Sequence, residues 1–107
     1  MGIDRLTAVT EALRKAGIRT RRGFPVGKMP YLTEPVAAVG PEQAQLDSVM
    51  VKVWIYSPMV LGGEKCEDTA MLAAQTLVRM GARYEMMGCE FDGKMGLYHV
   101  LLKSKFM

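Results

Sequence analysis

The sequence has few cysteines, a single histidine and little net charge, and these shortages exclude several classes of protein. Its two cysteines, Cys66 and Cys89, are too few for the disulfide framework of a small secreted domain. With His99 as the one histidine, they would need carboxylates or a second subunit to complete a metal site. We therefore expect both cysteines to be buried, reduced thiols.

Long hydrophobic runs are also missing. The longest apolar stretch, residues 49–56, is interrupted by Lys52, whereas a membrane helix needs about 18 apolar residues or more. Asp4 and Arg5 stand where a secretory signal would become hydrophobic. We expect no membrane segment and no membrane partner, and a location in the cytoplasm.

The chain contains enough apolar residues to form one hydrophobic core. Hydrophobic residues make up 50% of the 107 residues and charged residues 23%, whereas disordered chains combine low hydrophobicity with a high net charge. The length is that of one ordinary domain. The sequence therefore predicts a single domain over residues 1–107.

Two segments place apolar residues three and four positions apart, as one face of a helix requires. The first segment carries Ile3, Leu6, Val9, Leu13 and Ala16. The second carries Cys66, Ala70, Ala73, Ala74, Leu77 and Met80. A glycine follows each segment at the C-cap position. We predict two helices, the second with an alanine-rich face that can lie close to a sheet.

Four segments favour strands. Residues 36–39 predict a short strand that ends at Gly40-Pro41, and residues 46–56 predict a longer one. Residues 83–91 and 97–106 predict two more, joined by a turn at Asp92-Gly93. The order helix, two strands, helix, two strands predicts an α+β two-layer sandwich. Its four-stranded sheet is expected to be mainly antiparallel, with both helices on one face.

The longer strand presents two different rows of side chains. Helices on one face of the sheet can cover the valine and isoleucine row, which leaves Met50, Trp54 and Tyr56 facing water in a single copy. Such exposure forgoes several kcal/mol, at roughly 25 cal/mol per Å² of apolar area. Large exposed apolar patches indicate binding surfaces. We predict that these three residues form a subunit interface; the alternative is that the chain's own loop covers them.

Residues 18–35 show no periodicity and are rich in glycine and proline, so they predict a long, irregular loop that a partner orders. Basic residues are concentrated here, with no acid between Glu11 and Glu34. Basic side chains next to aromatics suit an acidic protein surface or the phosphates of a nucleic acid. The candidate partner-binding residues of this loop are Arg19, Arg21, Arg22, Phe24, Lys28 and Tyr31.

Signals for catalysis are weak throughout. Residues 23–29 differ from a phosphate-binding loop by one residue of spacing, and Met29 replaces the hydroxyl that would hold magnesium. Acidic residues around Cys66 oppose formation of a reactive thiolate. We expect no enzymatic activity, no cofactor and no metal site.

The expected elements follow one another in a definite order. The chain begins with a helix and an irregular segment, followed by a strand led by Pro35 and a long aromatic strand over 51–56 that stops at Pro58. A helix and a closing hairpin complete it. This order and the chain's size resemble the tail-terminator proteins of long-tailed bacteriophages and prophages. The resemblance implies a structural ring, commonly of six copies, that ends the tail tube and joins it to the head. It implies assembly in the host cytoplasm and a final place in the virion tail or neck.

The implied partners are further copies of the chain, the tail-tube protein, and neck or connector proteins, while DNA passes through the lumen without sequence-specific binding. Because a strongly basic lumen would slow the DNA, we expect the arginine loop to face protein. Replacing Arg19, Arg21 and Arg22 by Glu is then expected to abolish tube capping and to leave the fold intact. Two alternatives remain: another neck or head-completion connector protein, and a small regulatory α+β module that binds a ligand.

Overall fold

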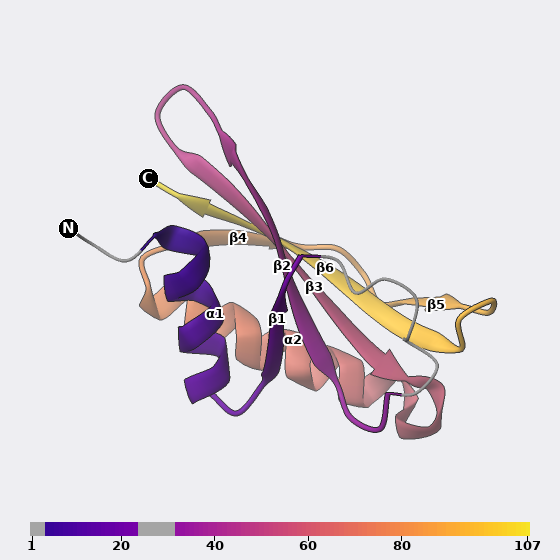
Figure 1. Ribbon diagram of the computed structural model, residues 1–107. Coiled ribbons are helices and arrows are strands. Elements are labelled where there is room, and N and C mark those ends of the chain that lie inside the picture. The colour runs from indigo at the N-terminus through magenta and orange to yellow at the C-terminus, as the bar shows by residue number, and fades with distance from the viewer. Residues whose placement is uncertain (1–3, 24–31) are drawn as a thin grey trace.

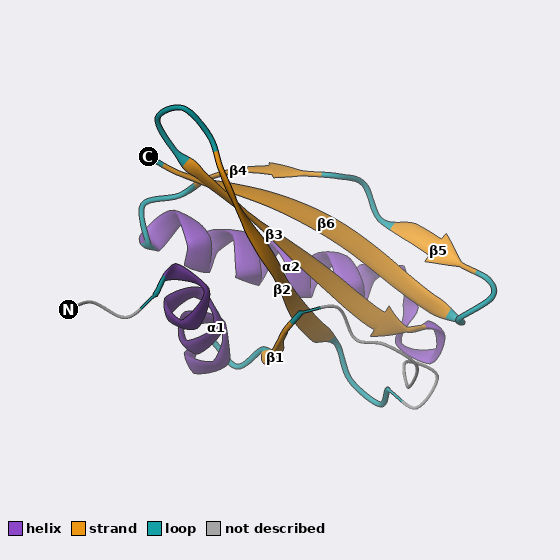
Figure 2. Ribbon diagram, turned by 45° about the horizontal axis from the view of Figure 1, so that its top comes forward, coloured by secondary structure: helices purple, strands orange, loops and turns teal. Residues whose placement is uncertain are grey.

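The computed structural model describes residues 4–23 and 32–107, which form two layers (Figures 1 and 2). Helices α1 (Arg5–Lys15) and α2 (Gly62–Arg79) lie on one face of a six-stranded sheet. The strands are β1 (Arg19–Arg22), β2 (Val36–Ala44), β3 (Val49–Pro58), β4 (Arg83–Met86), β5 (Glu90–Asp92) and β6 (Leu97–Phe106). A 3-10 turn, η2 (Met59–Leu61), joins β3 to α2. The predicted α+β two-layer sandwich is confirmed.

The sheet contains more strands than the four expected, and one pair is parallel. Its order is β1-β2-β3-β6-β4, with β5 also paired to β6. β1 runs parallel to β2, while the other pairs are antiparallel. The predicted strand over 83–91 is divided in two, because residues 87–89 lie outside the regular ladder between β4 and β5. Both parts pair with β6, so they form one interrupted edge.

β1 corrects the expectation of an irregular loop over 18–35, because residues 19–22 form a strand. Thr20 is buried on the helix side of the sheet, and its carbonyl oxygen accepts hydrogen bonds from Nε and Nη2 of Arg14. Because three of its four residues are arginines, β1 lacks the alternation of apolar and polar residues by which a strand is recognised in a sequence. Residues 24–31, which include Phe24, Lys28 and Tyr31, lie outside the described residues.

β2 does not end at Gly40-Pro41 as predicted, but continues to Ala44 across an irregularity between Val39 and Glu42. β1 pairs only with residues 36–39, so Pro41 stands where that side of β2 has no neighbouring strand. A residue without an N–H is tolerated at such a position. A Cβ at position 40 would lie 3.1 Å from the carbonyl oxygen of Lys52, which explains the glycine.

The two helices begin and end close to their predicted limits. The Asp4 side chain caps α1 by accepting a hydrogen bond from the Thr7 N–H at 3.0 Å. Gly17 and Gly81 follow the helices with φ of +91° and +90°, the left-handed conformation expected there. α2 begins at Gly62, inside the predicted turn, and Gly63 lies against the Tyr98 ring.

The core lies between the helices and the sheet. β3 contributes Val51, Val53 and Ile55, each with no exposed surface. The predicted alanine-rich face of α2 packs here, since Ala70, Ala73 and Ala74 are also fully buried. Within residues 4–23 and 32–107, no helix is long and apolar enough to cross a membrane.

Candidate functional site on the open face of the sheet

The face of the sheet turned away from α1 and α2 is called the open face (Figure 2). Strand register places its side chains in rows, because directly paired residues point to the same side. Four of these rows cross β3 and β6. From one end to the other they are Met50–Lys105–Arg83, Lys52–Lys103–Glu85, Ala38–Trp54–Leu101, and Val36–Tyr56–His99–Glu90. The open face therefore has a basic end and an aromatic middle.

The aromatic middle is a cluster of Trp54, Tyr56 and His99. The Trp54 and Tyr56 rings stack with centroids 6.2 Å apart, and the His99 ring meets Trp54 edge-on at 5.9 Å. His99 Nε2 also lies 3.9 Å from a carboxylate oxygen of Glu90. The sequence singled out Trp54 and Tyr56 but offered His99 only as the one histidine, and the register brings it beside them.

This middle is less exposed than the sequence suggested. Met50, Trp54 and Tyr56 were expected to face water in a single copy, but each is half-buried. The packing of Trp54 and Tyr56 on each other and on His99 accounts for part of this burial. Burial also raises the pKa of Tyr56, and the charge of Asp92 adds to the shift. The assignment of these residues to a subunit interface stays a prediction.

The basic end consists of Lys52, Arg83, Lys103 and Lys105. Lys52 stands directly opposite Lys103, and Lys105 stands directly opposite Arg83. Like charges directly opposite each other destabilise a sheet. Within the described parts of the chain, none of the four cations takes part in a salt bridge. The basic end is thus a concentration of positive charge that the Glu85 carboxylate, opposite Lys103, offsets only in part.

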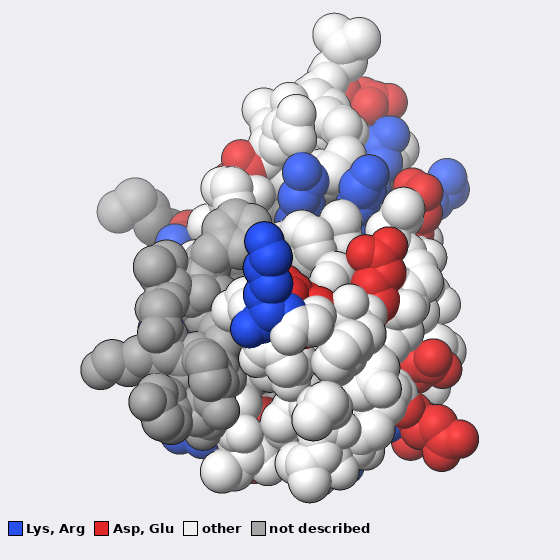
Figure 3. Space-filling model, turned by 90° about the vertical axis from the view of Figure 1, so that its right-hand side faces the viewer, with Lys and Arg blue, Asp and Glu red and all other residues white. Residues whose placement is uncertain are grey.

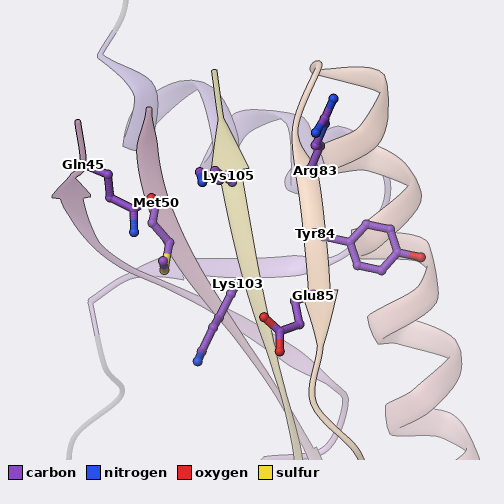
Figure 4. Close-up of a pocket in the computed structure, with 7 residues that line it drawn as sticks. All are labelled: Gln45, Met50, Arg83, Tyr84, Glu85, Lys103 and Lys105. Atoms are coloured by element: carbon purple, nitrogen blue, oxygen red, sulfur yellow. The ribbon is translucent and has the colours of Figure 1, made fainter. Parts of the chain in front are cut away.

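A shallow groove of about 290 Å³ lies on the basic end (Figure 4). Gln45 and Met50 line one side, Lys103 and Lys105 the floor, and Arg83 and Glu85 the other side, while Tyr84 points away toward the helix layer. Glu85, paired with Lys103 in the register, is the acid of this lining. The groove can accept an anionic group held by several lysine and arginine side chains.

The arginines of the predicted partner-binding loop have different environments. Arg19 and Arg21 share the side of the open face, in register with Val36 and Ala38. Arg19 forms a 3.0 Å salt bridge with Glu34. Arg22 belongs to the opposite side, where it donates a hydrogen bond to Thr7 Oγ1 and lies 3.9 Å from an Asp4 carboxylate oxygen. These three residues therefore do not form one uniform binding element.

The two cysteines are neighbours in space, which their separation in sequence did not indicate. Cys66 is fully buried in α2, as predicted, whereas Cys89 is half-buried. Burial raises the pKa of the Cys66 thiol to about 12, with the nearby Cys89 and Glu67 adding to the effect. Burial also raises the pKa of Cys89. Thiols held neutral in this way are poor nucleophiles.

Among the described residues, no group of three or more His, Cys, Asp or Glu side chains could hold a metal ion. The described chain is thus a two-layer α+β protein whose sheet has one face covered by its helices and one face that combines aromatics with cations. No protein-family model matches the chain, and no curated protein sequence matches it significantly.

The sequence patterns do not identify Lys52, Lys103, Lys105 and Arg83 as a group. Lys103 and Lys105 are two positions apart in β6, so strand alternation alone puts them on one side. The missing information was the register, which sets Lys52 of β3 and Arg83 of β4 beside them. Register depends on contacts between distant segments, so the spacing within one strand cannot supply it.

Proposed function

We propose that this chain is a structural assembly protein that forms a ring with further copies of itself, and that the ring ends a bacteriophage tail tube and joins it to the head. The observation that carries the proposal is the open face, where four cations that form no salt bridge within the described residues adjoin half-buried aromatics. Folding of a single copy does not require this combination, and charge at a surface gives specificity to protein association.

The resemblance to tail terminators supplies the particular role. Its segment order of opening helix, strand pair, second helix and closing hairpin is close to the order α1, β2–β3, α2 and β4–β6, although β1 is an additional strand. A ring protein does its work by recognition, because surface burial and charge complementarity provide the energy of its contacts. Its expected partners are the tail-tube protein and the neck or connector proteins.

Tail-tube assembly in the presence of the purified chain tests the proposal. Tail-tube protein polymerises alone or with the chain added, and negative-stain images record tube length and tube ends. We expect shorter tubes that carry a ring at one end. Rings that bind only isolated heads or portals would support the neck-connector alternative. A chain that stays monomeric at every concentration and leaves tube length unchanged would refute the proposal.

A further inference from the structure

The chain also carries exposed acidic residues away from the basic end. Glu64, Glu67 and Asp68 lie in the first two turns of α2, and all three are exposed; they are called the acidic turn. None of them takes part in a salt bridge within the described residues. In Figure 3, Lys and Arg lie mainly in the upper and central part of the side shown, with Asp and Glu both among them and along the lower right-hand edge.

The basic end and the acidic turn cannot neutralise each other in one copy. The start of α2 lies near the beginning of β6, because Gly63 adjoins Tyr98. Lys103 and Lys105 stand five and seven residues further along that strand, on the other face of the sheet. At about 3.4 Å per residue, these lysines lie roughly 17–24 Å along β6 from Tyr98. Glu67 and Asp68 lie about 6–8 Å further along α2 than Gly63, at about 1.5 Å per residue, but the sheet separates them from the lysines, so the two patches do not meet in one copy.

Two different, complementary patches on one chain are what a head-to-tail contact requires. In such a contact, one patch of a copy meets the other patch of the next copy, and the series closes into a ring when the rotation permits. The lysine and arginine pairs of the basic end carry an electrostatic cost in a single copy. An acidic surface from a second copy would offset this repulsion between cations, whereas a neutral partner would not.

We propose that the basic end of one copy binds the acidic turn of α2 of the next copy, as the head-to-tail contact of the ring. This inference rests on the proposed function, because it names the surfaces by which the copies join. The groove beside Met50 receives the carboxylates, with Lys103 and Lys105 at its floor and Arg83 at its side.

A nucleic acid is the other polyanion that could meet the basic end, and the structure favours the second copy. Stacking platforms for nucleic acids present aromatic faces that bases can reach. Here Trp54 and Tyr56 are half-buried and stack on each other. The formal net charge of the whole chain is only +3, whereas the three carboxylates of the acidic turn are opposite in sign to the four cations of the basic end.

Charge reversal on each patch tests the contact. One variant carries Lys103→Glu and Lys105→Glu, and the other carries Glu67→Lys and Asp68→Lys. Because close charge pairs across an interface are strongly coupled, we expect each variant alone to self-associate about 100-fold more weakly than the parent chain. An equimolar mixture of the two restores assembly, and so does one chain with all four substitutions. Sedimentation velocity at low salt measures each case.

A control variant with Lys15→Glu and Lys94→Glu makes the same change in net charge as Lys103→Glu, Lys105→Glu, but at exposed positions outside both patches. It is expected to assemble like the parent chain, and thermal unfolding checks that every variant is folded. In about 1 M salt, where the screening length falls to about 3 Å, the parent chain is expected to assemble less well.

The outcomes separate this inference from the proposed function. If the parent chain assembles and the two reversal variants assemble equally well, the ring uses other surfaces and the charge contact is wrong. If the parent chain never assembles, both proposals fail. Loss of binding to a single-stranded oligonucleotide in the Lys103→Glu, Lys105→Glu variant, with assembly unchanged, would assign the basic end to nucleic acid instead.

Discussion

The two faces of the sheet carry the same strands but different kinds of side chain. On the face covered by the helices, β3 presents Val51, Val53 and Ile55, none of which has exposed surface. On the open face, the intervening residues of that strand include Lys52, Trp54 and Tyr56, all half-buried. One face is explained by folding alone. The other keeps like charges opposite each other, which indicates a requirement other than the stability of one copy.

Adjacent leucines on β6 give the largest expected contrast between the faces. Leu102 belongs to the core with no exposed surface, whereas Leu101 is half-buried on the open face. We expect Leu102→Ala to lower the free energy of unfolding by about 3 kcal/mol, because it leaves a cavity. Leu101→Ala is expected to cost about 1 kcal/mol or less. Urea denaturation of dilute protein measures both, and equal losses would contradict the contrast.

The buried thiol of Cys66, on the covered face, makes the stability of the chain depend on pH. The pKa of Cys66 is about 12 in the folded chain, above its ordinary value of 9.0. The folded state therefore keeps a proton that the unfolded state loses between these values. This contribution to stability is complete below pH 9 and disappears as the pH rises toward 12. Unfolding free energies of the parent chain and of Cys66→Ala, measured across this range, should converge at high pH; parallel curves would contradict the pKa shift.

Sequence patterns predicted the elements and buried residues of the covered face well, because these depend on the spacing of apolar residues within one segment. Helical spacing identified both helices, and alternation identified the buried residues of β3 and the limits of β6. Such spacing predicts the fold because each helix or strand must bury one of its faces, and the apolar residues mark that face.

The parts that sequence patterns missed depend on contacts between segments. β1 has three arginines in four residues, and it is a strand because it pairs with β2. The continuation of β2 past Pro41 required knowledge that β1 ends opposite Val39. The basic end joins residues of three strands, so it exists only once the register is set.

The aromatic cluster allows a test of the open face that is independent of charge. We expect Trp54→Ala to weaken self-association about 10-fold or more, because large aromatics often dominate protein interfaces. Phe91→Ala is the matched control, since Phe91 is an exposed aromatic of β5 that packs on Tyr98. Sedimentation velocity measures association, and urea denaturation measures the loss of stability. If Trp54→Ala lowers stability but leaves association unchanged, the cluster serves only the fold of one copy.

The smallest expected effect distinguishes two neighbouring arginines on opposite sides of β1. Arg22 contacts Thr7 and Asp4 at the start of α1, so Arg22→Glu is expected to lower the free energy of unfolding by about 1 kcal/mol. Arg21 is exposed on the side of the open face, and Arg21→Glu is expected to change stability by less than about 0.5 kcal/mol. If the arginines bind a partner as predicted, Arg21→Glu should reduce tube capping even though it leaves stability nearly unchanged. Normal capping by a stable Arg21→Glu chain would remove Arg21 from the binding surface.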